Sequence, residues 1–364
     1  MSGIDLVMIV RDEARCLERC LASARPWVDG LVVLDTGSVD GTVEIARRAG
    51  ARLAHFDWID DFAAARNAAL AMSDAPWRLV LDADEWIAEG GESLTALRDR
   101  PADFIGQIRV ASLFDAGAAV DEAPNWLPRV LPRGVLYAGR IHEQPEGDLP
   151  RRRLPLMIGH DGYLDAQKAK KSGRNARLLG LALQARPEDA YLRYQLGKDL
   201  ELSARFAEAE PHYLLALEQC DLRAGWRHDL VLRTLFTLKR LGRFGQAMAL
   251  AEAEMPRWTG SPDFYFTLGD LLLDWVASRP EHAATLLPMV ESSWLRAIEI
   301  GEQPDLQDTV RGRGSFLAAH NLAVLHASLG AKAEAERWRE REAAFRADTP
   351  SGPLAAPGRP RQAA

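Results

Sequence analysis

The stretch LVLDADEW, residues 79–86, joins an apolar run to a cluster of carboxylates. Residues 79–81 are typical of the end of a buried strand, and Asp82, Asp84 and Glu85 follow where that strand would emerge. Because like charges repel, carboxylates this close together call for a cation. A hard divalent ion, which takes oxygen ligands and itself holds a substrate's phosphates, is one such cation. An acidic, solvated turn is the alternative that this stretch alone leaves open.

The composition indicates an ordinary soluble protein with room for two domains. The chain has 364 residues, of which 47% are hydrophobic and 27% charged. The formal net charge of -7 argues against a nucleic-acid binder, because affinity for phosphate backbones depends on clustered Lys and Arg. We find no apolar stretch near the roughly 20 residues that span a bilayer and no basic start of a signal peptide. We therefore expect a cytoplasmic protein, with peripheral contact to the inner face of the membrane left open.

The cysteines do not predict a metal site. Cys16, Cys20 and Cys220 lack the paired spacing of metal-binding motifs. Cys16 and Cys20 are four residues apart on a predicted helix and so share one face. We expect both to be small core residues.

The first half of the chain alternates short apolar runs with helical patterns. The runs 4–10, 30–34, 51–56 and 77–81 predict strands, and the segments between them predict helices. This alternation implies βαβ units and a parallel sheet. Ligands of such sheets bind beyond the carboxyl ends of the strands.

Polar residues follow the first and second predicted strands, as they follow the fourth. Residues 11–13 come after the first strand, and Asp35 precedes the loop 36–38 after the second. A carboxylate at Asp35 can accept hydrogen bonds from the N–H of a base. Gly37 lets the backbone approach a ligand closely, although it can equally be a plain turn residue. All these groups should meet at one edge of the sheet.

Four segments, in order and correctly spaced, resemble family 2 glycosyltransferases. They are MIVRDEARCLERCL (8–21), VVLDTGSVDGTVEIA (32–46), FDWIDDFAAARNAAL (56–70) and LVLDADEW (79–86). The nearest subgroup joins a nucleotide-sugar domain of the GT-A fold to tetratricopeptide-like helices. The resemblance covers residues 4–165 well and the remainder in general style. It implies an α/β GT-A domain, Rossmann-like with a mostly parallel sheet, over residues 1–165.

The resemblance assigns nucleotide contacts to residues near the strand ends. In similar GT-A enzymes the aspartate after the second strand reads the nucleotide base, which gives Asp35 that role. Arg66 matches an arginine that commonly touches the nucleotide, and its fork of donors suits phosphate or base oxygens. A surface charge on a helix is the alternative for Arg66. Val10 and Glu13, around the end of the first strand, complete the expected nucleotide-sugar contacts.

The DXD motif of the resembling enzymes falls on Asp82 and Asp84. It implies that Asp84 binds a divalent metal, Mn²⁺ or Mg²⁺, and that Asp82 contacts the ribose or the metal. Such an ion stabilises the charge that builds on the diphosphate as the sugar leaves. His142, and His160 from beyond the sheet, are further candidate metal ligands, since imidazole suits a manganese site. Each histidine alone can equally be structural.

An inverting transferase needs one carboxylate as a base, whereas a hydrolase needs a pair. The similar subgroup carries a recurrent His-Glu within the segment 129–145, which makes Glu143 the candidate base. Asp121 and Glu122 are the alternatives. Better-studied members of the family carry Glu-Asp at this point, so the sequence departs from their pattern here.

Two further segments are expected to be irregular. The segment 115–128 is rich in small residues and contains Pro124 and Pro128. The resemblance implies that it is an acceptor-side loop, and mobile loops that close over sugar nucleotides exclude water. Within it, Trp126 either stacks on an acceptor or packs. The segment 145–165, with its basic run 151–153, predicts the connection out of the first domain.

The second half predicts a helical repeat. Helix pairs match the 34-residue tetratricopeptide template over residues 166–348. Small and apolar residues at recurring positions are the ones that stacked helix pairs require. They are Leu196, Gly197, Ala209, Tyr213 and Ala216 in the first unit, Ala247 in the second, Leu268 and Gly269 in the third, and Leu322, Ala323, Gly330 and Ala335 in the fourth. Residues 349–364 are Pro-rich and predict a disordered tail.

These features predict a metal-dependent inverting glycosyltransferase that uses a nucleotide sugar. A UDP-sugar is the first candidate donor, with GDP and dTDP sugars left open. The acceptor is a protein, a peptide or a cell-surface glycan, and the helical repeats could also support a homo-oligomer. The alternative is a helical-repeat interaction protein with a degenerate, non-catalytic transferase domain, against which the intact site residues argue. A phosphoryl-transfer enzyme is a third reading, disfavoured by the missing Lys-containing phosphate loop.

Overall fold

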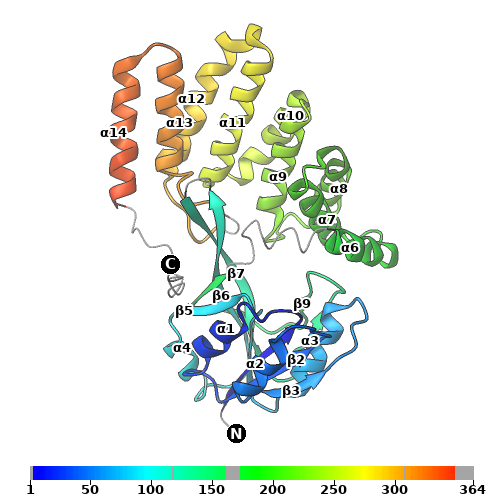
Figure 1. The fold of residues 1–364 in the computed structure, drawn as a ribbon. Helices are drawn as coiled ribbons and strands as arrows, with labels where there is room; N and C mark the ends of the chain where they lie inside the picture. Colours follow the sequence, from blue (N-terminus) through cyan, green and yellow to red (C-terminus); the bar gives the residue numbers. More distant parts are fainter. Residues whose placement is uncertain (1–2, 117–118, 161–172, 307–308, 349–364) are drawn as a thin grey trace, which may run out of the picture. The chain divides into compact units, whose positions relative to one another are not determined.

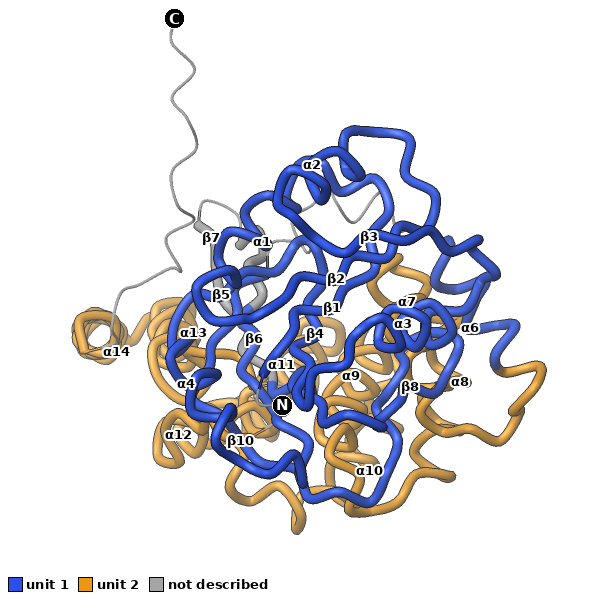
Figure 2. Tube along the Cα trace, turned by 90° about the horizontal axis from the view of Figure 1, so that it is seen from below, with its two compact units in different colours: residues 1–182, 356–364 blue, residues 183–355 orange. Residues whose placement is uncertain are grey.

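The structure, a computed structural model, describes residues 3–116, 119–160, 173–306 and 309–348. The chain divides into two compact units, the first ending at Ala182 and the second beginning at Leu183. Figure 2 colours them separately. We call them the sheet unit and the helical unit. The predicted boundary after residue 165 and the predicted tail over 349–364 lie outside the described residues and stay predictions.

Within the described residues the sheet unit holds an eight-stranded sheet in the order β3-β2-β1-β4-β7-β6-β10-β5 (Figure 1). The strands β3, β2, β1 and β4 run parallel, as the alternating pattern predicts. β7 is antiparallel to both β4 and β6, and β10 is parallel to β6 and antiparallel to β5. The bounds are β1 (Ile4–Val10), β2 (Gly30–Asp35), β3 (Arg52–His55), β4 (Trp77–Val80), β5 (Glu85–Glu89), β6 (Ile105–Ala116), β7 (Ala119–Pro132) and β10 (Arg151–His160). A separate short pair consists of β8 (Tyr137–Ala138) and β9 (Gln144–Pro145).

Helices cover both faces of the parallel part of the sheet, which explains its continuous apolar runs. Along β1, Leu6 and Met8 pack into a core that includes Leu17 and Leu21 of α1. The alternate residue Val7 belongs to a second core on the opposite face, with residues of α3. The helices of this unit are α1 (Leu17–Ala24), α2 (Thr42–Arg48), α3 (Phe62–Ala71) and the short α4 (Glu92–Thr95).

Two segments predicted to be irregular are strands instead. Residues 119–128, which the resemblance placed in an acceptor-side loop, belong to β7 and pair with β6. Residues 130–132 of the same strand pair with β4. The basic run 151–153, predicted to lead out of the domain, begins β10 and pairs with β6. Long-range pairing overrides the weak strand propensity of both segments, because a partner strand supplies the missing hydrogen bonds.

The helical unit consists of helices that stand side by side in Figure 1. In the described residues they are α7 (Ala190–Leu202), α8 (Phe206–Gln219), α9 (Arg227–Arg240), α10 (Phe244–Glu254), α11 (Pro262–Ser278), α12 (Ala283–Ile300), α13 (Phe316–Ser328) and α14 (Lys332–Asp348). The division between the two units falls within the preceding helix α6 (Arg174–Ala185). The short helices η1 (Met255–Arg257) and η2 (Pro280–His282) lie between the helices of the helical unit.

The predicted small residues lie where paired helices meet. A Cβ added to Gly197 of α7 would lie 2.5 Å from Cε1 of Tyr213 in α8. A Cβ on Gly269 of α11 would likewise collide with the ring of Trp294 in α12. Ala209 and Ala247 are both fully buried. The tetratricopeptide-like prediction is therefore confirmed in the packing as well as in the helix pairs.

Cys16 and Cys20 are core residues, as predicted, and Cys220 is buried as well. Cys16, Cys20 and Cys220 are buried and form no disulfide. Burial, the largest effect, raises the pKa of the Cys16 and Cys20 thiols, which keeps both protonated. None of the helices in the described residues is long and apolar enough to cross a membrane.

Candidate active site

The loops after β1 and β2 are joined by hydrogen bonds at the carboxyl edge of the sheet. The carbonyl of Val10 accepts the N–H of Thr36 at 2.9 Å and its hydroxyl at 3.0 Å. Asp12 has a φ of 54° and accepts the N–H of Val39 at 2.8 Å. The backbone N–H of Glu13 donates to the hydroxyl of Thr42 at 2.7 Å. The edge therefore gathers the predicted residues Val10 and Glu13 beside the loop that follows Asp35.

Asp35 ends β2 and is held by the loop that follows it. Its carboxylate accepts the N–H of Gly37 at 3.1 Å and that of Ser38 at 3.2 Å, and Nδ1 of His55 lies 3.4 Å away. Partial burial acts to raise the pKa of Asp35, but these hydrogen bonds lower it overall. Gly37 has a φ of 104°, which supports its role as a turn residue. Asp35 is thus an ionised acceptor at the edge where a nucleotide is expected.

Asp82 follows β4 and is paired with two arginines. Nη2 of Arg66 donates to Oδ1 of Asp82 at 2.7 Å, and Nη2 of Arg129 donates to Oδ2 at 2.9 Å. Burial acts to raise the pKa of Asp82, but the two guanidinium groups hold it well below its usual range. The side chain of Asp82 stays 37% exposed, so it can still be reached from solvent.

Arg66 joins Asp82 to the predicted base. Its Nε donates to Oε1 of Glu143, and the side chains of Arg66 and Glu143 are 8% and 9% exposed. Arg66 also lies over the ring of Tyr137, with Cζ 5.6 Å from the ring centroid. The alternative of a surface charge at Arg66 is therefore wrong, and Glu143 lies beside the DXD motif.

The segment that carries Glu143 is fixed on α3. Asn67 donates to the carbonyl of Tyr137 at 2.9 Å and accepts the N–H of Tyr137 at 2.8 Å. The N–H of Phe62, the first residue of α3, donates to the carbonyl of Arg140 at 2.8 Å. Asp61 caps α3 by accepting the N–H of Ala64 at 2.9 Å. The helix that presents Arg66 thus also positions the chain around Glu143.

Glu85 completes the cluster of charges at the strand ends. Its Oε1 accepts a hydrogen bond from Nη2 of Arg129 at 2.7 Å, and its Oε2 accepts one from the backbone N–H of Asp82 at 2.8 Å. Burial raises the pKa of Glu85, although Arg129 opposes that effect. We call Arg66, Asp82, Glu85, Arg129 and Glu143 the strand-end cluster.

Asp84 and His160 approach each other next to this cluster. Oδ2 of Asp84 lies 3.4 Å from Nε2 of His160, and their side chains are 10% and 14% exposed. The sequence suggested that His160 lies beyond the sheet, and this prediction is wrong. His160 ends β10 and pairs with Glu85 of β5, so antiparallel pairing brings it to the DXD motif. His142 precedes Glu143 with a φ of 51°. The alternative bases Asp121 and Glu122 lie in a part of β7 whose side chains are not described.

The side chains around Asp84 suit a divalent ion that takes part of its ligands from a bound phosphate. Within the described residues they do not supply a complete set of protein ligands. Over the described ranges of the chain, no three His, Cys, Asp or Glu side chains gather as a metal site. A divalent ion in a nucleotide site typically takes one or two carboxylates and completes its shell with phosphates and water. Among the described residues, Nη1 of Arg66, Nε of Arg129 and Oη of Tyr137 are buried without a hydrogen-bond partner. An anionic oxygen or an ordered water would satisfy such donors.

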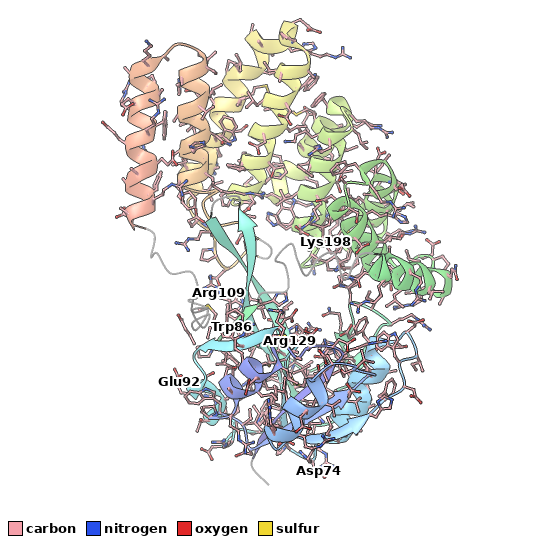
Figure 3. The ribbon with its side chains drawn as sticks, in the orientation of Figure 1. Asp74, Trp86, Glu92, Arg109, Arg129 and Lys198 are labelled. Carbon is pink, nitrogen blue, oxygen red and sulfur yellow. The ribbon has the colours of Figure 1, made fainter. Side chains whose placement is uncertain are left out.

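Sequence reasoning missed Arg129. It sits in the apolar segment WLPRVLP of β7 (Figure 3), and its partners Asp82 and Glu85 are more than forty positions earlier. The available signal was a lone arginine in an apolar strand pattern, because a buried arginine requires a carboxylate partner.

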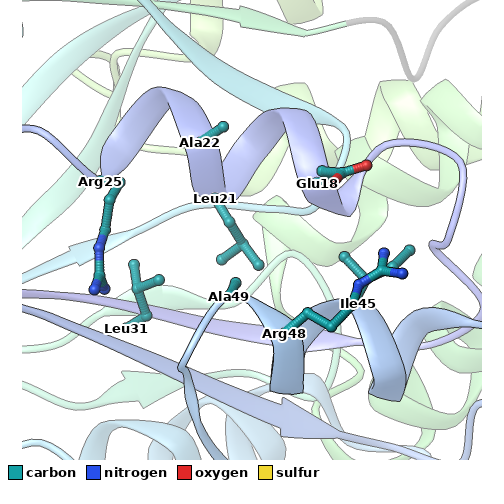
Figure 4. Close-up of a pocket in the computed structure, with 8 residues that line it drawn as sticks. All are labelled: Glu18, Leu21, Ala22, Arg25, Leu31, Ile45, Arg48 and Ala49. Atoms are coloured by element: carbon teal, nitrogen blue, oxygen red, sulfur yellow. The ribbon is translucent and has the colours of Figure 1, made fainter.

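The sheet unit also has a pocket that does not include the strand-end cluster. It is lined by residues of α1, α2 and β2, among them Leu21, Arg25, Leu31 and Arg48, and has a volume of about 260 Å³ (Figure 4). Leu31 is near the start of β2, whereas the candidate site is at the carboxyl ends of the strands. The pocket is thus separate from the strand-end cluster.

A mostly parallel sheet with carboxylates and guanidinium groups at its carboxyl edge is typical of a nucleotide-binding enzyme, here followed by a helical repeat. The family described as Glycosyl transferase family 2 matches residues 5–119. A TPR repeat-containing protein of Synechococcus elongatus is 33% identical over 309 residues, 78% of this chain and 76% of that protein. The prophage-derived glycosyltransferase SunS of Bacillus subtilis is 25% identical over 286 residues, 73% of this chain and 66% of SunS.

Among solved structures, glucosyl-3-phosphoglycerate synthase from Mycobacterium tuberculosis, in complex with Mn²⁺, UDP and glucosyl-3-phosphoglycerate, is 22% identical. It has a TM-score of 0.26, over 32% of this chain and 46% of that one. On the sequence relationships, the chain belongs to the family 2 glycosyltransferases that carry a tetratricopeptide-like repeat. It is a glycosyltransferase.

Proposed function

We propose that the protein is a metal-dependent inverting glycosyltransferase that transfers a sugar from a nucleotide-sugar donor, with a UDP-sugar as the first candidate. The observation that carries this proposal is the meeting of Asp82, Arg66 and Glu143 at the carboxyl edge of the sheet. They come from a strand end, a helix and a later loop, yet Arg66 binds both carboxylates. A single carboxylate beside the donor-binding motif is what inversion requires.

In this proposal Glu143 is the base. It accepts the proton of the acceptor hydroxyl as that oxygen attacks the anomeric carbon from the face opposite the leaving diphosphate. Arg66 orients the carboxylate, because its Nε donates a charge-assisted hydrogen bond to Oε1 of Glu143. The low exposure of Glu143, 9% for the side chain, excludes bulk water and limits hydrolysis of the donor.

Asp84 is the proposed metal ligand, assisted by Asp82 and His160, with His142 as a further candidate. When bound, Mn²⁺ or Mg²⁺ supplies Lewis-acid stabilisation of the diphosphate leaving group. The contact between Asp84 and His160 supports a shared ligand role for these two residues.

The nucleotide is proposed to lie along the ends of β1 and β2. Asp35 would accept the N–H of the base, and Val10 and Glu13 would line the same edge. Support comes from the hydrogen bonds that hold these loops together and from the ionised state that the loop favours for Asp35. A pre-formed loop lowers the entropic cost of binding the nucleotide.

The acceptor is proposed to be a protein or peptide, or a cell-surface glycan, modified in the cytoplasm or at the inner face of the membrane. Stacked helix pairs offer an extended concave face on which a chain-like acceptor, or a second copy of this chain, can bind. This supports a polymeric acceptor over a small soluble one.

The test is release of nucleoside diphosphate from UDP-, GDP- and dTDP-sugars, each offered with heat-treated lysate proteins and glycans as acceptors, with Mn²⁺ and with EDTA. We expect turnover of donors of one nucleotide, lost in EDTA and restored by Mn²⁺. Anomeric configuration is then read by NMR on the transferred sugar. Folded protein that turns over no donor, or turnover that EDTA leaves unchanged, would contradict the proposal.

A further inference from the structure

Arg129 is the cation that connects the two acidic side chains at the ends of the DXD stretch. A single nitrogen, Nη2, donates to Oδ2 of Asp82 at 2.9 Å and to Oε1 of Glu85 at 2.7 Å. The loop is also closed on itself, because Asp82 N–H donates to Glu85 Oε2 at 2.8 Å and Glu85 N–H donates to the carbonyl of Asp82 at 3.0 Å. Arg129 therefore ties a closed acidic turn to β7.

The charges around the turn make this connection hard to replace. The side chain of Glu85 is 3% exposed and that of Arg129 is 12% exposed. Arg66, the other guanidinium, divides its donors between Asp82 and Glu143. Arg129 is thus the guanidinium that compensates Glu85, and a buried carboxylate without a cation is strongly unfavourable.

Arg129 can affect donor binding without contacting the substrate, because it acts through Asp82. Its Nη2 donates to two protein carboxylates, while its buried Nε has no hydrogen-bond partner among the described residues. What it controls is the direction in which Asp82 presents its remaining, partly exposed surface. A shift of about 1 Å in a binding group can cost on the order of 10²-fold in rate.

We propose that Arg129 is a positioning residue for glycosyl transfer, which fixes Asp82 in the orientation that binds the donor by bridging it to Glu85. This rests on the proposed function, in that Asp82 is taken to contact the donor.

Removing Arg129 alone would leave Glu85 buried and unpaired, and the protein could fail to fold. The informative variant is therefore Arg129→Met with Glu85→Gln, which removes both charges and keeps the apolar stem. Glu85→Gln alone is its reference, because Arg129 can still bind Asp82. Arg129→Lys tests rescue, since one nitrogen makes both contacts. Arg133→Ala, an exposed arginine paired with Asp74, is the surface control.

The first readout is amide hydrogen exchange of the donor-free protein. In the double variant we expect the amides of Asp82 and residue 85 to exchange about tenfold or more faster than in Glu85→Gln, with β1 and β2 unchanged. Equal exchange in the two variants would overturn the proposal, because Arg129 would then not hold the turn.

The second readout is the donor KM measured by nucleoside diphosphate release from UDP-glucose and UDP-N-acetylglucosamine with Mn²⁺. We expect KM to rise about tenfold and kcat/KM to fall about 10²-fold in the double variant relative to Glu85→Gln. Arg129→Lys should keep KM near that of the wild type. Loss of folded protein lowers the apparent kcat and leaves KM unchanged, so a fall in kcat alone would contradict positioning.

The two readouts separate the two proposals. A wild-type protein that turns over no donor contradicts the proposed function, whereas hydrogen exchange needs no donor and still decides whether Arg129 holds Asp82.

Discussion

Both units bury charged side chains, but the two sets are balanced differently. The strand-end cluster contains three carboxylates, Asp82, Glu85 and Glu143, and two guanidinium groups, Arg66 and Arg129. In the helical unit, what we call the helical-core cluster pairs the carboxylates Glu201 and Asp229 with the cations Lys198 and Arg233. The first set carries an excess negative charge and the second is neutral.

The two clusters also differ in how completely their hydrogen-bond donors are satisfied. In the helical-core cluster Arg233 donates to Asp229 at 2.6 Å and to Glu201 at 2.8 Å, and Tyr213 donates to Glu201 at 2.6 Å. In the strand-end cluster donors of Arg66 and Arg129 lack a partner among the described residues. A cluster that is complete within the protein supports folding, whereas one with unmatched charge and unmatched donors is suited to a ligand.

The largest effect that this comparison predicts is on turnover, at Glu143. Glu143→Gln keeps the shape and a hydrogen-bond acceptor for Arg66 but cannot accept a proton. We expect donor turnover to fall by on the order of 10² to 10⁴, with donor affinity near that of the wild type. Nucleoside diphosphate release and donor titration measure the two quantities. Near wild-type turnover would remove Glu143 from the mechanism.

The next effect is on stability, at the helical-core cluster. Arg233→Ala leaves Asp229 and Glu201 buried with only Lys198 nearby, so we expect a loss of about 3–5 kcal/mol in the free energy of unfolding of the helical unit. Urea unfolding measures it. Arg205→Ala, which removes an exposed pair with Glu208, is the control and should change stability by about 0.5 kcal/mol or less. If both variants had the same free energy of unfolding, the helical-core cluster would not stabilise the helical unit.

A smaller effect is predicted for Asp270 in α11, and it depends on pH. Burial raises the pKa of Asp270 to about 6 from an ordinary value of 3.8. The protonated form is favoured by folding, so this group's stabilising contribution is full below about pH 4 and is lost as the pH rises through about 6. Asp270→Asn should therefore stabilise the helical unit by about 1–3 kcal/mol at pH 8 and have little effect at pH 4.

Thermal or urea unfolding at the two pH values checks the Asp270 prediction. The amide oxygen of the variant can still accept from Asn321, which donates to Asp270 at 3.2 Å. Asp221→Asn is the control, since Asp221 is exposed in the helical unit and its oxygen can still accept the N–H of Arg223 after the change. A gain at pH 4 as large as that at pH 8 would mean that the effect is not one of ionisation.

The sequence predicts the parts of the fold whose signals are local. The strands β1 to β4 appear as apolar runs, and the polar residues after them reach the same edge. The helix pairs appear through small residues such as Gly197, which faces Tyr213. In each case the pattern repeats within a short window, so the chain's own periodicity specifies the element.

The parts that were missed depend on pairing between distant segments. β7 and β10 read as loops because Pro and small residues weaken strand propensity, and only their partners in the sheet make them strands. His160 and Arg129 reach the DXD motif through those same strands. Motif matching could place Asp82 and Glu143 but could not reveal that Arg66 binds both.

The most direct test of the strand-end site is calorimetric titration with UDP-, GDP- and dTDP-sugars, with and without Mn²⁺, on the wild type and on Asp84→Ala. Asp74→Ala, whose side chain is 79% exposed, is the control. We expect one donor to bind the wild type and Asp74→Ala only with Mn²⁺, and Asp84→Ala to lose that binding while its unfolding temperature stays close to the wild-type value. Wild-type affinity in Asp84→Ala would contradict the assignment of the donor site to the strand ends.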